Sequence, residues 1–160
     1  MRVRLQLDLP ADARLLPRTR WALRGYLEEL GASDEVAGDI ILALDEACAN
    51  VVRHAFPEGD GSFRLLAELS HTEVVFQVED HGVGFNPYET TGLGVELEAT
   101  SGRGLRLIRQ LMSSVEVESP MADGGTRLLM RKSLQGDDPA APPGAESPMA
   151  VFGEDIIRLG

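Results

Sequence analysis

Residues 33–55, SDEVAGDIILALDEACANVVRHA, constrain the fold most strongly, because their pattern predicts one long helix with two different sides. An α-helix turns by about 100° per residue, so one stripe collects apolar side chains. They are Val36, Ile40, Leu44, Ala47, Val51 and Ala55. A second stripe, near the opposite edge, collects Asp39, Ala43, Glu46, Asn50 and Arg53. We expect a helix that Ser33 caps, that buries the first stripe and that presents the second as a polar one.

The segments around this helix predict a sheet with helices on one face. Residues 2–9 alternate between apolar and polar side chains, which is typical of a half-buried strand. Further strands are predicted at 63–69, 74–79, 114–119 and 126–134, and further helices at 13–30 and 105–112. The expected fold is an α/β (α+β) two-layer sandwich, in which helices cover one face of a mixed, mostly antiparallel sheet.

Composition narrows the class of protein. The chain has 160 residues, a formal net charge of −11 and a sequence pI of about 4.6. A general nucleic-acid binder needs a basic surface, so we expect no direct contact with nucleic acid. The sequence shows no apolar run long enough for a membrane span and no signal peptide. Its single cysteine, Cys48, fits a reducing compartment, and we expect a cytoplasmic protein.

The composition changes at about Gln135. The segment QGDDPAAPPGAESP is rich in proline and has no aromatic residue, and a short apolar stretch ends the chain. Such composition is typical of linkers and disordered segments. We expect one globular domain over residues 1–134 and a disordered tail over residues 135–160. The apolar end of the tail either docks on its own domain or on a partner, or stays disordered.

Three short motifs carry candidate chemistry, and the first is the pair Glu46 and Asn50. Their i, i+4 spacing places both side chains on one face of the helix. A carboxylate there can orient or deprotonate a hydroxyl group, and an amide oxygen can ligate Mg²⁺. Taken alone, such a pair is more often a solvated helix face.

The second motif, VVFQVEDHGVGF, delivers Asp80 at the end of a predicted strand, followed by Gly82 and Gly84. An aspartate in this position can accept a hydrogen bond from an exocyclic amine such as that of adenine. The glycines allow a ligand to approach the backbone closely. A plain turn is the alternative interpretation.

The third motif, SGRGLRLIRQL, places Gly102, Arg103 and Gly104 directly before a predicted helix. A glycine-rich entry into a helix offers free backbone N–H groups and the positive end of the helix dipole to a phosphate. A helix entry softened by glycine is the alternative. The chain contains no Walker A loop, and no G-x-G-x-x-G motif follows its first strand.

The order of these motifs resembles one protein family. The segments LDEACANVVRHAF, VEDHGVGFNP, GRGLRLIRQLMSSVEVES and GGTRLLMRKSL are similar to the successive motifs of the GHKL (histidine-kinase-like) ATPases. The resemblance covers about residues 5–134 and is strongest to the short bacterial anti-sigma factor serine kinases. It implies the GHKL ATPase fold and the use of ATP and Mg²⁺.

The resemblance also implies roles for individual residues. Glu46 matches the base that acts on the acceptor hydroxyl, Asn50 the ligand of the phosphate-bound Mg²⁺, and Asp80 the residue that recognises adenine. The other matches are Gly82 and Gly84 beside the base, Gly102, Arg103, Gly104 and Leu105 in the phosphate loop, and Thr126 near the adenine through a water. The resemblance implies a lid over the nucleotide at residues 85–101. This lid is short, and residues 88–100 do not align with those of the family.

One residue departs from the family pattern, and the roles of several others are left open. His81 stands where the family often has an acidic or small residue. His54 is expected to be a structural residue near the end of its helix, although it could face the same groove. Arg18, Arg20 and Arg24 form a basic strip on the first predicted helix, which helps to bind partners in the family. A solvated face explains the strip at least as well.

The resemblance implies an ATP-dependent protein serine kinase that acts as an anti-sigma factor. Such a protein binds a sigma factor, phosphorylates a STAS-type antagonist protein and usually forms a homodimer. Two alternatives use the same motifs. One is an ATP-binding module that sequesters a partner without phosphoryl transfer, and the other is a regulator that acts outside sigma control.

Overall fold

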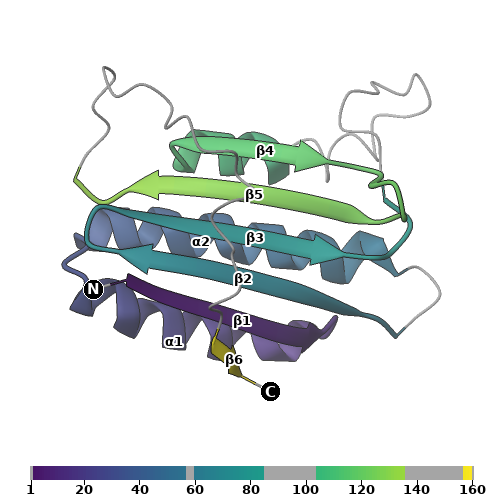
Figure 1. Cartoon of the computed structure of the whole chain (residues 1–160), viewed down its shortest axis with the longest axis horizontal. Helices are drawn as coiled ribbons and strands as arrows, with labels where there is room; N and C mark the ends of the chain where they lie inside the picture. The colour runs from purple at the N-terminus through teal and green to yellow at the C-terminus, as the bar shows by residue number, and fades with distance from the viewer. Residues whose placement is uncertain (1, 57–59, 85–103, 136–156, 160) are drawn as a thin grey trace.

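A six-stranded sheet forms one layer of the computed structural model, which describes residues 2–56, 60–84, 104–135 and 157–159 (Figure 1). The strands are β1 (Arg2–Pro10), β2 (Ser62–Ser70), β3 (Glu73–Asp80), β4 (Ser114–Glu118), β5 (Thr126–Ser133) and β6 (Ile157–Leu159). Their order in the sheet is β4-β5-β3-β2-β1-β6. Four neighbouring pairs are antiparallel, and only β1 with β6 is parallel. The predicted mixed, mostly antiparallel sheet is therefore confirmed.

The end of the chain takes part in this sheet. Leu5, Gln6 and Leu7 of β1 pair in register with Ile157, Arg158 and Leu159 of β6. Of the three possibilities considered for the apolar end of the tail, the structure shows docking on its own domain. The expectation of disorder for residues 136–156 lies outside the described residues.

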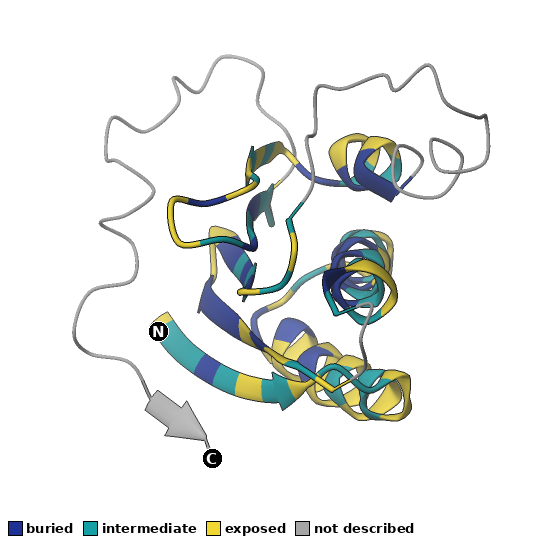
Figure 2. Cartoon of the chain, turned by 90° about the vertical axis from the view of Figure 1, so that its right-hand side faces the viewer, coloured by how far each residue is buried: buried dark blue, intermediate teal, exposed yellow. Residues whose placement is uncertain are grey.

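The second layer consists of helices that all lie behind the sheet in Figure 1: α1 (Leu16–Glu29), α2 (Asp34–Asn50) and a helix at residues 104–111. Figure 2 shows the two layers from the side, with buried residues between them. This arrangement is the predicted two-layer sandwich with helices on one face. Within the described residues, no helix combines the length and the apolar character needed to cross a bilayer.

α2 occupies the middle of the helical layer, between α1 and the helix at 104–111 (Figure 2). A middle helix is covered from both sides as well as by the sheet, so it buries more than one stripe. Ile40, Leu44 and Ala47 are buried as predicted. The assignment of Ala43 to the polar stripe was wrong, because its side chain is 0% exposed and belongs to the core.

The first helix differs from the prediction at its start. Instead of one helix from Ala13, the chain forms a 3₁₀ turn, Ala13–Leu15, and then α1. Asp12 caps the 3₁₀ turn, and its carboxylate accepts a hydrogen bond from the Arg14 N–H at 2.9 Å. Pro17 follows within the first turn of α1, where its missing N–H needs no partner.

α2 ends at Asn50, but the helical path continues to Ala55 as a single π turn, η2 (Val51–Ala55). The predicted extent of the helix is therefore right, while its last turn is wider than an α turn. Single π turns occur frequently at functional sites in helices. Here the turn places Val51, His54 and Ala55 beside the same cavity as Asp80, the last residue of β3.

Strand alternation decides which side chains of β3 face the helices. Val74, Phe76 and Val78 are buried in the core between the layers. Because successive strand residues point to opposite faces, Asp80 continues this series and lies on the helix side at the end of the strand. The same pairing register places Thr126 of β5 directly beside it.

Ser33→Ala tests the cap that starts α2. The Ser33 Oγ accepts a hydrogen bond from the Val36 N–H at 3.2 Å. Losing this cap is expected to lower the free energy of unfolding by about 1 kcal/mol. Urea denaturation measures the change, with Ser62→Ala as the control for an exposed serine without a cap. Equal stability of the two variants would show that the cap contributes nothing.

Candidate functional site

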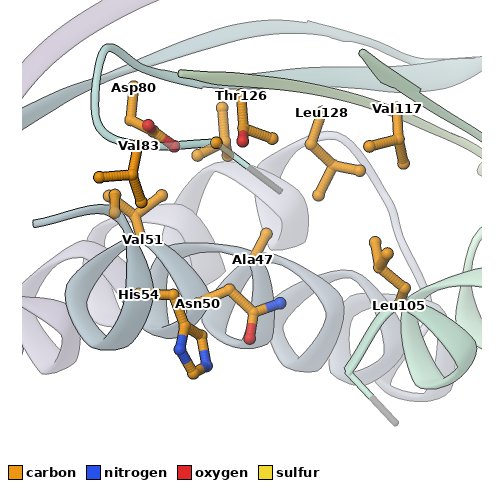
Figure 3. A pocket seen from close by; sticks show the side chains of 13 residues that line it. Ala47, Asn50, Val51, His54, Asp80, Val83, Leu105, Val117, Thr126 and Leu128 are labelled. Carbon is orange, nitrogen blue, oxygen red and sulfur yellow. The ribbon is translucent and has the colours of Figure 1, made fainter. Parts of the chain in front are cut away.

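A cavity of about 260 Å³ lies between α2–η2 and the sheet, next to the ends of β3 and β5. Its walls are Ala47, Asn50, Val51, His54, Ala55, Val78, Asp80, Val83, Gly84, Leu105, Val117, Thr126 and Leu128. Figure 3 shows Asn50 and His54 on the helical side, and Asp80 and Thr126 on the side of the sheet. Most of the other walls are apolar. The cavity thus suits a largely apolar group with a few polar atoms.

Asp80 is the buried acid of this cavity, with 4% of its surface exposed. Its Oδ1 accepts a hydrogen bond from the Gly82 N–H at 2.9 Å. Burial raises the pKa of the Asp80 carboxyl above its ordinary value, and the backbone N–H groups of Gly82 and Thr126 partly oppose this rise. A buried carboxylate beside a cavity can accept a hydrogen bond from an amine on a ligand.

Thr126 begins β5 and lines the cavity next to Asp80. Its hydroxyl is within hydrogen-bond distance of the Ser119 hydroxyl, with 2.7 Å between the two oxygens. The chain between them turns through Gly124 and Gly125, which both have positive φ. The end of β3 and the start of β5, which both follow the first two helices in sequence, therefore supply Asp80 and Thr126 to the cavity.

Gly82 ties the end of β3 to the π turn. A Cβ on Gly82 would overlap the carbonyl oxygen of Ala55, so only glycine fits at this position. The next residue fixes the same contact, because the Val83 N–H donates to the Ala55 oxygen at 3.0 Å. The second motif is thus held against the end of the helix that carries the first motif, and Gly84 lines the cavity beyond it.

The third motif reaches the same place through Gly104 and Leu105. Gly104 begins the helix at 104–111, and Leu105 is buried and lines the cavity. A Cβ on Gly104 would lie 2.7 Å from Glu46 Oε1 and 3.1 Å from Asn50 Nδ2. The glycine therefore lets the third motif approach both polar residues of the first. Gly102 and Arg103, and the lid expected at residues 85–101, lie outside the described residues.

Asn50 has an unusual environment for an amide. Its Oδ1 is buried and, among the described residues, has no hydrogen-bond partner. Buried polar atoms are normally paired, so this oxygen fits a ligand that the protein alone does not supply. A hard cation such as Mg²⁺ accepts this kind of oxygen. The described residues contain no group of three or more His, Cys, Asp or Glu side chains that could hold a metal, so further ligands would have to come from a bound phosphate or water.

Glu46 lies one turn before Asn50, at the rim and not in the wall of the cavity. Its Oε1 faces the position of Gly104 and also contacts the guanidinium of Arg53 at 3.3 Å. A carboxylate beside a ligand-binding cavity can orient or deprotonate a hydroxyl group that approaches the ligand. The structure therefore brings together the described residues of all three motifs.

Some residues of the cavity were not predicted from the sequence. His54 lines the wall, although it was expected to be structural. Val78 and Leu128 form part of the apolar side. The strand pattern held a usable signal for these two, since each lies two residues from a predicted site residue and so shares its face.

Comparison with known proteins identifies the class of protein. The sequence profile of the histidine kinase-like ATPase domain matches residues 9–132, which is most of the chain. The chain therefore belongs to the histidine kinase-like ATPase family. The resemblance drawn from the order of the motifs is confirmed.

Named relatives define the type more closely. The serine-protein kinase RsbW of Bacillus mycoides (strain KBAB4) is 30% identical over 141 residues, which cover 82% of this chain and 86% of that protein. RsbW of Bacillus thuringiensis (strain Al Hakam) is 29% identical with the same coverage. The family and these relatives together support a protein kinase that uses ATP.

A solved structure supports the fold. The structure of the RsbU and RsbW domains of Rv1364c from Mycobacterium tuberculosis matches with a TM-score of 0.61 and 24% identity. The match covers 82% of this chain but only 32% of that longer chain. The predicted GHKL fold is therefore confirmed for the domain.

Proposed function

We propose that this chain is an ATP-dependent protein serine kinase and anti-sigma factor, which binds a sigma factor and phosphorylates a serine on a STAS-domain antagonist. The similarity to RsbW serine-protein kinases supports the proposal. The observation that carries it is the approach of Gly104 to both Glu46 and Asn50 beside the Asp80 cavity. The proposal places the kinase domain at residues 1–134 and the protein in the cytoplasm, where sigma factors act.

The cavity would hold the purine of ATP. Asp80 accepts a hydrogen bond from the exocyclic amine, and Thr126 lies close enough to share the polar end of the base. Gly82 and Gly84 keep the backbone close to the base. The apolar walls then exclude water from the rest of the ring.

The phosphates would extend from the cavity toward the start of the helix at 104–111. Gly102, Arg103, Gly104 and Leu105 would form the phosphate loop, since backbone N–H groups at a helix start favour anions. Asn50 would hold Mg²⁺ through its unpartnered Oδ1. The ion would offset the charge of the phosphates during phosphoryl transfer.

Glu46 would act on the acceptor. Its carboxylate lies at the rim, where a serine of a second protein can approach the end of the triphosphate. It orients the serine hydroxyl and accepts its proton while the γ-phosphoryl group moves to the serine oxygen and ADP leaves. Position and charge contribute most of the acceleration in such reactions.

α1 offers a candidate docking surface for the protein partners. Trp21 is 81% exposed on this helix. Arg18 and Arg24 are also exposed and, within the part of the chain that the structure describes, form no ion pair, whereas Arg20 pairs with Asp45 at 3.2 Å. An exposed aromatic side chain with nearby arginines is typical of interface anchors. The proposal therefore includes a partner that docks on α1 through an acidic surface. It also includes the homodimer that the family resemblance implies.

Incubation with γ-labelled ATP, Mg²⁺ and a purified STAS-domain protein of the same organism tests the function. Label on a serine of the STAS protein, located by mass spectrometry, is the expected result. ATP binding without any transfer would instead support the binding module. Co-purification of the chain with a regulator other than a sigma factor would support the alternative of a regulator that acts outside sigma control.

Two glycine variants separate site geometry from folding. The Cβ of Gly104→Ala would displace the ends of the Glu46 and Asn50 side chains, so we expect nearly unchanged stability and a loss of transfer of about 10-fold. The Cβ of Gly82→Ala would meet the rigid backbone of Ala55, so that variant is expected to unfold at lower temperature. Thermal unfolding and transfer assays on both variants check this. Normal transfer by Gly104→Ala would contradict the assigned geometry.

A further inference from the structure

The polar stripe of α2 continues past Asn50 to Arg53, to which neither the motifs nor the proposed mechanism assigns a role. Glu46, Asn50 and Arg53 follow one another at i, i+4 and i+7, so they lie on one face across two turns. Arg53 stands in the π turn η2, three residues after Asn50, the residue proposed to hold the metal. From the π turn, its side chain therefore reaches Glu46 at the rim of the site.

Two hydrogen bonds fix the Arg53 guanidinium. Its Nε donates to the carbonyl oxygen of Ala49 at 3.3 Å. Its Nη2 donates to Glu46 Oε1, also at 3.3 Å. The planar fork of arginine holds its donors in a fixed geometry, so one bond to the backbone orients the donor that meets the carboxylate.

The contact to Glu46 involves the oxygen that matters for the site. Glu46 Oε1 is the same atom that lies 2.7 Å from the position of a Cβ on Gly104. One oxygen of the carboxylate is thus held between Arg53 on its own helix and the start of the third motif. The second oxygen is left for other contacts.

The pair contributes little to folding. The side chains of Arg53 and Glu46 are 44% and 22% exposed, and ion pairs as exposed as this one add little stability. A carboxylate that acts on a hydroxyl, in contrast, must be held close to its working geometry, and small displacements lower rates strongly. The contact is therefore expected to affect the reaction and not the fold.

We propose that Arg53 is a positioning residue: the Ala49 carbonyl orients its guanidinium, and the guanidinium holds the Glu46 carboxylate against Gly104 so that it faces the acceptor. This inference rests on the proposed kinase function. It concerns the reaction step and not nucleotide binding, because Arg53 is not among the residues that line the cavity.

The test compares wild type with Arg53→Gln, Arg53→Lys and Glu46→Gln. Arg64→Gln is the control, since Arg64 forms an exposed pair with Asp8 at 2.9 Å on the sheet, away from the cavity. Two readouts are needed. One is kcat and KM for ATP with the STAS-domain protein as acceptor, and the other is the backbone amide resonance of Gly104 in nucleotide-free protein.

We expect Arg53→Gln to lower kcat about 10-fold with an unchanged KM for ATP. Arg53→Lys should retain intermediate activity, because an ammonium group reaches one acceptor but not both. The Gly104 resonance should move in Arg53→Gln as in Glu46→Gln, while Arg64→Gln matches wild type. Wild-type kcat together with an unmoved Gly104 resonance in Arg53→Gln would overturn the inference, and so would a change confined to KM.

The two proposals fail in different ways. If wild type transfers no phosphate, the kinase function fails, but the Gly104 resonance still decides whether Arg53 holds Glu46. If wild type is active, Glu46→Gln is inactive and both Arg53 variants remain fully active, the function stands and the positioning role is wrong. Arg53→Lys keeps the test valid even if the glutamine variant unfolds.

Discussion

Glu46→Gln is expected to lower the rate of phosphate transfer by about 100-fold or more. Glutamine has nearly the shape of glutamate, but it cannot accept the proton of the serine hydroxyl. Glu46 lies outside the wall of the cavity, so the affinity for ATP should stay unchanged. The expected pattern is a large loss in kcat at constant nucleotide affinity.

Single-turnover transfer to the STAS-domain protein, together with isothermal titration of ATP and Mg²⁺, measures the two quantities separately. Glu35→Gln is the matched control, because Glu35 is an exposed glutamate in the first turn of the same helix. Transfer at the wild-type rate by Glu46→Gln would remove Glu46 from the mechanism. A loss of affinity without a loss of rate would move its role to nucleotide binding.

Asp80→Asn is expected to weaken ATP binding by about 10- to 100-fold while it stabilises the free protein. The amide oxygen of asparagine can still accept the Gly82 N–H, but then its NH₂ group faces the ligand. Two donors, this NH₂ and the exocyclic amine of adenine, would oppose each other. The carboxylate therefore matters for recognition because it is an acceptor on both oxygens.

The gain in stability follows from the raised pKa of Asp80. Burial raises this pKa above its ordinary value of 3.8. For an acid with a raised folded-state pKa, the stability linked to the neutral form is present below 3.8 and is lost as the pH rises through the folded value. At neutral pH the buried charge costs stability, and asparagine removes that cost.

Thermal unfolding of wild type and Asp80→Asn at neutral and at acidic pH tests this sign. The variant should melt higher at neutral pH, and the difference should shrink as the pH is lowered toward 3.8. Titration with ATP and Mg²⁺ gives the affinity. A variant that binds ATP as well as wild type would refute the assignment of Asp80 to adenine, and one that melts lower at neutral pH would refute the cost of the buried charge.

Much of the fold could be predicted because its signals are local. The cap at Ser33 and the alternation in β1 depend on neighbours within a few residues. One error arose where the neighbours are distant in sequence. Ala43 is buried because α2 is flanked on both sides in the helical layer, and a single helix pattern carries no information about such neighbours.

The candidate site divides in the same way. The spacing of Glu46 and Asn50, and the position of Asp80 at a strand end, were readable because helix and strand periods are fixed. The order of the motifs then indicated the family. The strand period also held a signal for the apolar wall residues Val78 and Leu128. Whether His54 lies in the wall depended instead on which faces of separate elements meet.

The sequence by itself determined most of the helices and strands, the family and the identity of the polar side chains, because hydrophobic period, caps and motif order are written along the chain. Only the tertiary structure decided that Gly104 lies against Glu46 and Asn50, and that Gly82 lies against the π turn. The physical reason is that these contacts join separate segments at distances of a few ångströms. Such distances are fixed by how the layers pack and not by any local preference of the chain.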